Sequence, residues 1–257
     1  MSDLNNNPAA RYGGVTRTAA EIDQGLRSYM LGVYNYMAIG LAITGLFALG
    51  IYMLSISSVP TPYSIRGGLY LTQLGYTLFV SPLKWVVILA PLAMVFFLSF
   101  RVDKMSVGAA QLTFWAYAAM VGVSLAVLLM VYTHTSIARV FFISAASFGA
   151  LSLWGYTTKR DLSGWGNFLF IGLIGIILAS LVNIFVASTM MQWIISCVGV
   201  LVFAGLTAYD TQQIKEMYDV NDDGTATGRK SIMGALRLYL DFLNLFLMLL
   251  NLFGNRE

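Results

Sequence analysis

Charged residues are scarce in this chain of 257 residues: they make up 11% of it, whereas a soluble domain carries about 25%. Hydrophobic residues make up 58%, and the mean hydropathy is +0.74. This composition excludes an ordinary soluble core and predicts an integral membrane protein in contact with a lipid bilayer. Basic and aromatic residues do not interleave in any patch of the sequence, so we expect no nucleic-acid partner.

Cysteine occurs once, as Cys197 in an apolar run, which excludes an internal disulfide and a metal site built from several cysteines. The region near Met1 has no short apolar segment, which argues against a cleaved signal peptide. The sequence also lacks a P-loop, a G-x-S-x-G and an H-E-x-x-H motif, so we expect neither an enzyme nor a resident cofactor. We predict a polar cytoplasmic N-terminal tail over residues 1–28 and one membrane domain over residues 29–257.

Seven long apolar stretches qualify as membrane spans, because about 20 apolar residues in a helix cross about 30 Å of hydrocarbon. They cover residues 29–54, 83–100, 107–131, 137–156, 166–187, 190–212 and 232–253. Each is too long and too continuously apolar for a strand. The sequence therefore predicts an all-α integral membrane protein, a bundle of seven transmembrane helices. In the longest connection we expect a short interfacial helix around residues 69–79.

Basic residues are distributed unevenly between the connections. Ten of the fifteen lie in the N-terminal tail and in the second, fourth and sixth connections. They are Arg11, Arg17, Arg27, Arg101, Lys104, Lys159, Arg160, Lys215, Arg229 and Lys230. Because Lys and Arg concentrate on the cytoplasmic side of a membrane protein, we predict a cytoplasmic N-terminus. Seven spans then put the C-terminus outside.

Two aspartates, Asp210 and Asp241, lie in the last two predicted spans. A carboxylate in hydrocarbon costs about 2.5–3.5 kcal/mol on insertion scales, so an acid within a span is a candidate functional residue. The direction of the spans puts both residues in the cytoplasmic half of the bundle. Two carboxylates that approach in a low dielectric do not both ionise readily, and they titrate as a coupled pair. The sequence therefore predicts a proton switch or a cation site here.

The last predicted span also carries a polar stripe about 80° wide, at about 100° of rotation per residue. The stripe consists of Arg237, Asp241, Asn244, Met248 and Asn251. Such a stripe is costly against lipid, so we predict that the seventh helix is central and that Asn244 and Asn251 face a pore. The alternative for the two asparagines is hydrogen bonding between helices. Arg237 either opposes protonation of the aspartates or extends to the cytoplasmic surface.

Four segments resemble a known family. They are TAYDTQQIKEMY (207–218), GALRLYLDFLNLFLMLLNLFG (234–254), TTKRDLSGWGNFL (157–169) and SPLKWVVILAPLAMVFF (81–97). The first two resemble the C-terminal signature of the Bax inhibitor-1 (TMBIM) family, and the other two resemble its bacterial branch. The resemblance covers nearly the whole chain after the polar tail, and it implies a seven-helix fold around a central last helix.

The resemblance also implies a function, a pH-sensitive leak of Ca²⁺ across the membrane. The family's two aspartates, here Asp210 and Asp241, then form the pH sensor and ion gate. An arginine at the inner end of the second helix latches the closed state; Arg101 is the nearest match, and Arg237 is a second candidate latch. Hard cations prefer oxygen ligands, and an ionised pair offers up to four, so both aspartates are candidate Ca²⁺ ligands. The bacterial resemblance implies the inner membrane.

Three other functions compete with the ion leak. One is a proton-coupled carrier, whose flux curves alone could mimic those of a leak. Bacterial members of the family are also linked to regulation of a membrane-bound ATP-dependent protease, and the polar tail is the segment suited to contact it. Paired aspartates on neighbouring spans also mark presenilin-type intramembrane proteases. Here, however, LYLD (238–241) stands in place of G-x-G-D, and no Pro-Ala-Leu motif follows because the last proline is Pro91. We therefore disfavour proteolysis.

The segment DVNDDG (219–224) matches the first half of an EF-hand loop, D-x-[DN]-x-[DN]-G. The twelfth position of that loop would be Lys230, where an EF-hand has a bidentate glutamate. Two interpretations remain open, a polar turn between helices and a weak cytoplasmic Ca²⁺ contact.

Overall fold

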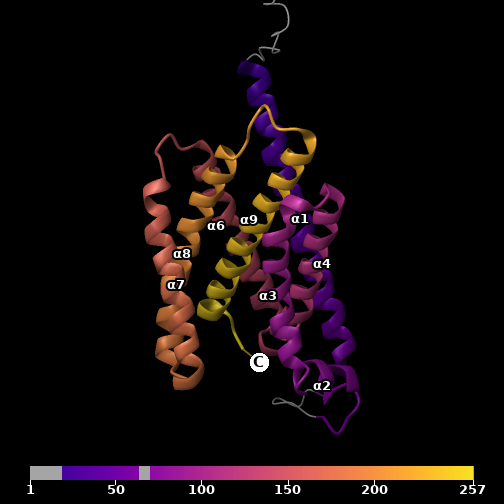
Figure 1. Ribbon diagram of the computed structural model, residues 1–257. Helices are drawn as coiled ribbons and strands as arrows, with labels where there is room; N and C mark the ends of the chain where they lie inside the picture. The colour runs from indigo at the N-terminus through magenta and orange to yellow at the C-terminus, as the bar shows by residue number, and fades with distance from the viewer. Residues whose placement is uncertain (1–18, 64–69, 257) are drawn as a thin grey trace, which may run out of the picture.

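The computed structural model describes residues 19–63 and 70–256, which form a bundle of long helices (Figure 1). The long helices are α1 (Ala19–Ser55), α3 (Lys84–Arg101), α4 (Val107–Leu125), α6 (His134–Thr157), α7 (Ser163–Val186), α8 (Thr189–Glu216) and α9 (Gly224–Phe253). The short elements are α2 (Gln73–Phe79), the 3-10 helix η2 (Val102–Lys104), α5 (Leu128–Val131) and two antiparallel strands, β1 (Ile56–Ser57) and β2 (Tyr70–Leu71).

Within the described residues, seven helical segments are long and apolar enough to cross a membrane. They are α1, α3 with η2, α4 with α5, α6, α7, α8 and α9. This confirms the predicted all-α membrane protein with seven transmembrane helices. The short helix predicted around residues 69–79 is present as α2, but it begins only at Gln73, because Tyr70 and Leu71 form strand β2; residue 69 lies outside the described residues.

Two helices begin at least two helical turns before the spans predicted for them. α1 begins at Ala19 rather than at residue 29, and α9 begins at Gly224 rather than at residue 232. Asp223 caps α9, because its carboxylate accepts a hydrogen bond from the backbone N–H of Ala226 at 2.6 Å. Hydropathy marks where a helix enters hydrocarbon, whereas helical hydrogen bonding continues through the polar turns before that point.

α9 occupies the centre of the bundle. It packs against α1, α4, α6 and α8, and Figure 1 shows it between α8 and α1. In an 18-residue apolar window of α9, 67% of the residues are buried, compared with 11–39% in the other six spans. The predicted central position of the seventh transmembrane helix is therefore confirmed.

Close backbone contacts and buried hydroxyl groups join the helices around α9. Gly155 of α6 meets the backbone of Ala208 in α8, and a Cβ atom added to Gly155 would collide with the Ala208 carbonyl oxygen. The hydroxyl groups of Thr44 in α1 and Tyr239 in α9 lie 2.6 Å apart, and Thr44 also donates to the Ala118 carbonyl of α4 at 2.9 Å. In lipid, such packing and interhelical hydrogen bonds take over the role that the hydrophobic effect has in water.

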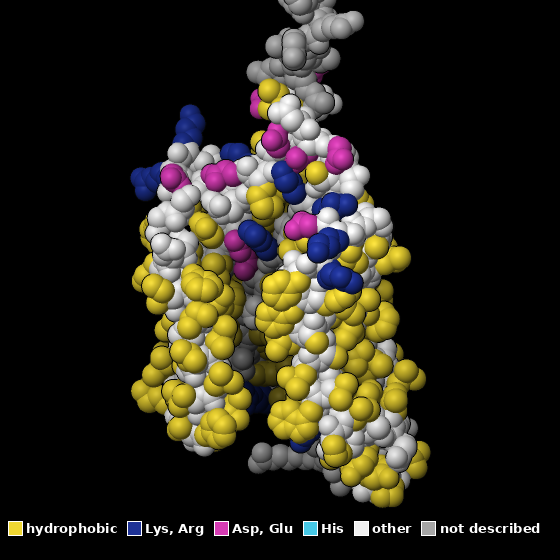
Figure 2. Space-filling model, in the orientation of Figure 1, with side chains coloured by type: hydrophobic (Ala, Val, Ile, Leu, Met, Phe, Trp, Pro, Cys, Tyr) yellow, Lys and Arg dark blue, Asp and Glu magenta, His cyan; other side chains and the backbone are white. Residues whose placement is uncertain are grey.

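Most charged side chains on the visible face gather at one end of the bundle, where α1 begins and α8 ends (Figure 2). We call this the charged end. Hydrophobic side chains cover the remaining length of the helices in the same view. This division is what a membrane requires of a spanning bundle, because an uncompensated charge is costly in hydrocarbon.

Candidate functional site

The structure brings together the two aspartates singled out in the sequence. Asp210 lies near the end of α8, and Asp241 lies on the facing side of α9, with their carboxyl groups within hydrogen-bonding reach of one another. Asp210 is half-buried, whereas Asp241 is only 5% exposed. The Oδ2 atom of Asp241 is buried and accepts no hydrogen bond from a described donor. A proton shared with Asp210 is the group that would satisfy this oxygen.

A chain of hydroxyl groups runs beside the aspartate pair and joins three helices. The Tyr34 hydroxyl of α1 lies 2.7 Å from the Ser152 hydroxyl of α6, which in turn lies 2.9 Å from the Thr211 hydroxyl of α8. Thr211 also donates to the Thr207 carbonyl of its own helix at 2.7 Å. Because Thr211 follows Asp210 directly, this chain fixes the part of α8 that presents the carboxyl group to α9.

Arg237 lies one helical turn before Asp241 and is the arginine that acts electrostatically on both carboxyl groups. Its side chain is exposed and lines a cavity of about 300 Å³ at the charged end, formed by the end of α3, η2, the end of α8 and the start of α9. Within the described residues, its guanidinium forms no salt bridge with either aspartate. The interpretation that Arg237 extends towards the surface fits this position.

Arg101 lies elsewhere, at the end of α3. Its side chain is exposed, and the central carbon of its guanidinium lies 6.0 Å from the ring of Phe97, on the same helix. α3 packs mainly on α4, away from α8. Of the two candidate latches, the structure therefore brings only Arg237 close to the pair, and the latch function of either arginine stays a prediction.

The two asparagines predicted to face a pore have different surroundings. Asn244 donates to the Leu240 carbonyl of its own helix at 2.8 Å and lines a cavity of about 340 Å³ between α7, α8 and α9. Asn251 instead accepts hydrogen bonds from Tyr132 at 3.1 Å and from the side chain of Gln192 at 3.4 Å. Asn251 thus links neighbouring segments by hydrogen bonds, which agrees with the alternative interpretation of hydrogen bonding between helices rather than with a pore-facing position. In Figure 2 the bundle is visibly hollowed between α7 and α3.

Several polar residues at the charged end have functions that the sequence did not reveal. Arg229 of α9 donates to the carbonyl oxygens of Met105 and Asp103 at 2.7 Å each, and so ties the start of α9 to the α3–α4 connection. Gln212 of α8 holds the α6–α7 connection by bonding the backbone of two residues, Arg160 and Leu162. From the sequence, Arg229 contributed only to the predicted orientation in the membrane, and Gln212 was only a polar residue. Their bonding partners are backbone carbonyl and amide groups, which every part of a chain has, so the sequence does not single them out.

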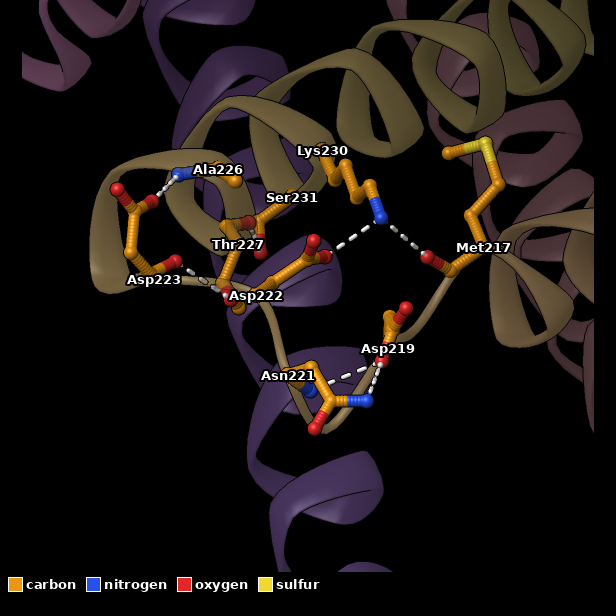
Figure 3. Close-up of polar contacts among 9 residues, drawn as sticks. All are labelled: Met217, Asp219, Asn221, Asp222, Asp223, Ala226, Thr227, Lys230 and Ser231. Atoms are coloured by element: carbon orange, nitrogen blue, oxygen red, sulfur yellow. Dashed lines mark hydrogen bonds and ion pairs between the residues drawn. The ribbon is translucent and has the colours of Figure 1, made fainter. Parts of the chain in front are cut away.

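The segment that resembles half of an EF-hand is a turn, not a loop (Figure 3). α9 begins at Gly224, so the second half of the supposed loop is helical. Asp219 accepts hydrogen bonds from the backbone and side chain of Asn221, Asp222 pairs with Lys230, and Asp223 caps α9. Within the described residues, no group of three or more acidic, histidine or cysteine side chains is arranged to hold a metal ion. The polar-turn interpretation is the one that the structure supports.

Comparison with known proteins agrees with this architecture. A family model described as "Inhibitor of apoptosis-promoting Bax1" matches residues 26–257. The chain is 45% identical over 235 residues to the inner membrane protein YbhL of Escherichia coli strain K12, a match that covers 91% of this chain and 94% of YbhL. It is 45% identical to an uncharacterised protein of Rickettsia prowazekii, with 91% and 92% covered, and 41% identical to one of Caulobacter vibrioides over the full length of both. The chain belongs to the Bax inhibitor-1 family.

Proposed function

We propose that this protein is a pH-sensitive Ca²⁺ leak channel of the bacterial inner membrane, gated by Asp210 and Asp241. The observation that carries the proposal is the contact between these two carboxyl groups inside the bundle, where one buried oxygen of Asp241 has no donor among the described residues. The inner-membrane location follows the name of the relative YbhL. The distribution of basic residues supports a cytoplasmic charged end. The proposal assigns no catalytic activity to the chain.

The chemistry of the pair suits a hard cation in one protonation state only. Ca²⁺ takes oxygen ligands at about 2.3–2.6 Å and is held by carboxylates, carbonyls and water. When both aspartates are ionised they attract a divalent cation, and the cation offsets their mutual repulsion. When they share a proton, one negative charge is lost and the carboxyl groups bond to each other instead of to the ion. Acidification is therefore expected to slow the leak.

Two cavities flank the pair along α9 and supply the remainder of the proposed path. Arg237 lines the cavity at the charged end, and Asn244 lines the cavity between α7, α8 and α9. Asp241 lies between these two residues on the same helix. An ion that passes between the cavities would therefore meet the carboxyl pair midway.

The test is Ca²⁺ flux into liposomes that contain the purified protein, measured as a function of pH. Asp210→Asn and Asp241→Asn keep the size of the side chains but remove the shared proton, and each is expected to abolish the pH dependence of the flux. Asp161→Asn is the matched control, because Asp161 is exposed in the α6–α7 connection. An unchanged rate and pH profile in both pair variants would contradict the proposal.

The alternative, modulation of a membrane-bound ATP-dependent protease with little transport, stays a prediction. The segment proposed to contact the protease lies mostly in residues 1–18, outside the described residues. Because the structure describes α1 from Ala19 onward, a deletion of residues 1–18 removes most of this segment and leaves the described part of the helix intact. Loss of protease regulation with intact Ca²⁺ flux in that deletion would show that the two functions are separate.

A further inference from the structure

A groove of about 670 Å³ runs between α1 and α6 in the half of the bundle nearest the charged end. Along α1 it extends from Arg27 to Tyr34, and along α6 from Phe148 to Tyr156. These stretches correspond to about 10–12 Å of helix, at about 1.5 Å per residue. The groove therefore reaches from the end of the bundle well into the depth of one leaflet.

The groove opens at the surface of the bundle, and the described residues do not fill it. Leu31 and Leu153, which line it, are 54% and 62% exposed. A Cβ atom added to Gly149 would meet no atom within 4 Å. The one buried hydroxyl in its lining, that of Ser152, is already bonded to Tyr34 and Thr211. A site with so few free polar groups does not hold water well but accommodates a hydrocarbon chain.

A cation lies at the mouth of the groove, at the charged end. Arg27 is exposed and lines the groove, and its guanidinium forms no salt bridge within the described part of the chain. The nearest acid along α1 is Asp23, one turn earlier and further from the hydrocarbon. A long arginine at this depth places its guanidinium at the level of lipid headgroups. It would be complementary to a phosphate there.

We propose that the α1–α6 groove binds an anionic phospholipid from the leaflet at the charged end. Its phosphate pairs with Arg27, and one acyl chain lies along Leu31 and over Gly149. The proposal is independent of Ca²⁺ transport, since it rests on the shape and charge of this groove alone. The Ser152 hydroxyl that lines the groove lies 2.9 Å from the hydroxyl of Thr211, the neighbour of Asp210, so the lipid would lie against the chain of hydroxyl groups that runs beside the aspartate pair.

The test uses two probes with a photoreactive acyl chain, phosphatidylglycerol and phosphatidylcholine, each a minor component of phosphatidylcholine vesicles that contain the full-length protein. Labelled peptides are located by mass spectrometry. Phosphatidylglycerol is expected to label residues 27–34 and 148–156 in preference to phosphatidylcholine. Arg27→Gln should lower the labelling by phosphatidylglycerol about fivefold and leave that by phosphatidylcholine unchanged.

Gly149→Leu fills the groove and should lower labelling by both probes. Gly175→Leu is the matched control, because Gly175 of α7 is exposed and also has no atom within 4 Å of an added Cβ. Equal labelling by the two probes in the wild type, or labelling of Gly149→Leu at the wild-type level, would overturn the proposal.

Discussion

Arg237 and Asp241 lie one turn apart on α9, yet Arg237 is exposed in the cavity at the charged end while Asp241 is 5% exposed among the helices. The positive charge thus lies at the entrance to the site and the negative pair lies behind it. A cation that enters from this end must pass the guanidinium before it meets a carboxyl group. The two residues are therefore expected to oppose each other in transport, with Arg237 setting the pH at which the pair is ionised.

Replacement of Arg237 by glutamine should move the pH profile of Ca²⁺ flux to higher pH, by up to about one pH unit. The positive charge favours the ionised form of nearby carboxyl groups, so a higher pH is needed for ionisation once that charge is gone. The measurement is flux into liposomes across a pH series. Arg101→Gln is the matched control and should leave the midpoint in place, because Arg101 lies over Phe97 on α3. A shift in Arg101→Gln alone would identify Arg101 as the latch that the family resemblance implies.

The contact between α6 and α8 should not tolerate a side chain at Gly155. A methyl group there would collide with the Ala208 backbone, so Gly155→Ala must separate the two helices. We expect a loss of about 1–3 kcal/mol in the free energy of unfolding. Gly149→Ala, on the same helix, places its methyl group in open space and should be neutral or slightly stabilising. Thermal unfolding of both variants in detergent provides the comparison, and equal stabilities would contradict the close approach of the backbones.

Arg229 should stabilise the α3–α4 connection through its two hydrogen bonds to backbone carbonyl groups. Arg229→Gln is expected to cost about 1–3 kcal/mol, because hydrogen bonds from a charged donor are among the stronger ones. Hydrogen exchange of residues 102–106 should become faster in this variant. Lys104→Gln removes a positive charge from the same connection without removing those bonds, and should change exchange little. Exchange unaltered in Arg229→Gln would show that the connection is held by other contacts.

Asp161 makes the start of α7 sensitive to acid. The hydroxyl and backbone N–H of Ser163 both donate to its carboxylate, which holds the pKa of Asp161 below its ordinary value of 3.8. A carboxyl group whose pKa is lowered by folding contributes stability above its unfolded pKa, and this contribution disappears as the pH falls through the folded value. In the wild type, the Ser163 amide should therefore lose protection against hydrogen exchange once the pH is lower than about 3.8. In Asp161→Ala it should be low at every pH.

The transmembrane architecture could be predicted because its signals are local. Twenty apolar residues in a row indicate a span whatever surrounds them, and the polar stripe of the last span indicated its central position. The contact of Asp210 with Asp241 was also within reach, since a buried acid needs a partner and only two acids lie in the spans. The ends of the helices were harder to predict from the sequence, because α1 and α9 begin at Ala19 and Gly224, before their apolar runs begin.

Contacts with backbone atoms could not be predicted. Arg229 is separated by more than a hundred residues from Met105. Every residue has a carbonyl group, so the sequence does not indicate which carbonyl groups Arg229 bonds. The same holds for Gly155, whose need for a small side chain appears only when the Ala208 backbone is placed beside it. Arg101 was the first candidate latch from the sequence and Arg237 the second, and only the packing of α3 on α4 showed that Arg101 lies away from the pair.

Asn244 and Asn251 share a stripe on α9, but they should respond differently to substitution. Asn244 bonds its own helix, whereas Asn251 bonds Tyr132 and Gln192 at the end opposite the charged end. There the chain after α9 also pairs with the start of α6, since the backbone of Asn255 bonds the Ser136 hydroxyl at 2.9 Å.

Asn251→Ala should therefore lower the free energy of unfolding by about 1 kcal/mol, a typical value for a hydrogen bond between membrane helices, and Asn244→Ala by less. Thermal unfolding in detergent measures both. In the flux assay, Asn244→Ala should have the larger effect. It should change the rate of Ca²⁺ flux, because Asn244 lines the cavity next to the aspartate pair. Asn251→Ala should keep the pH midpoint of the wild type. If Asn251→Ala instead shifted that midpoint, the end of α9 would be part of the gate, and the aspartate pair alone would not set the pH response.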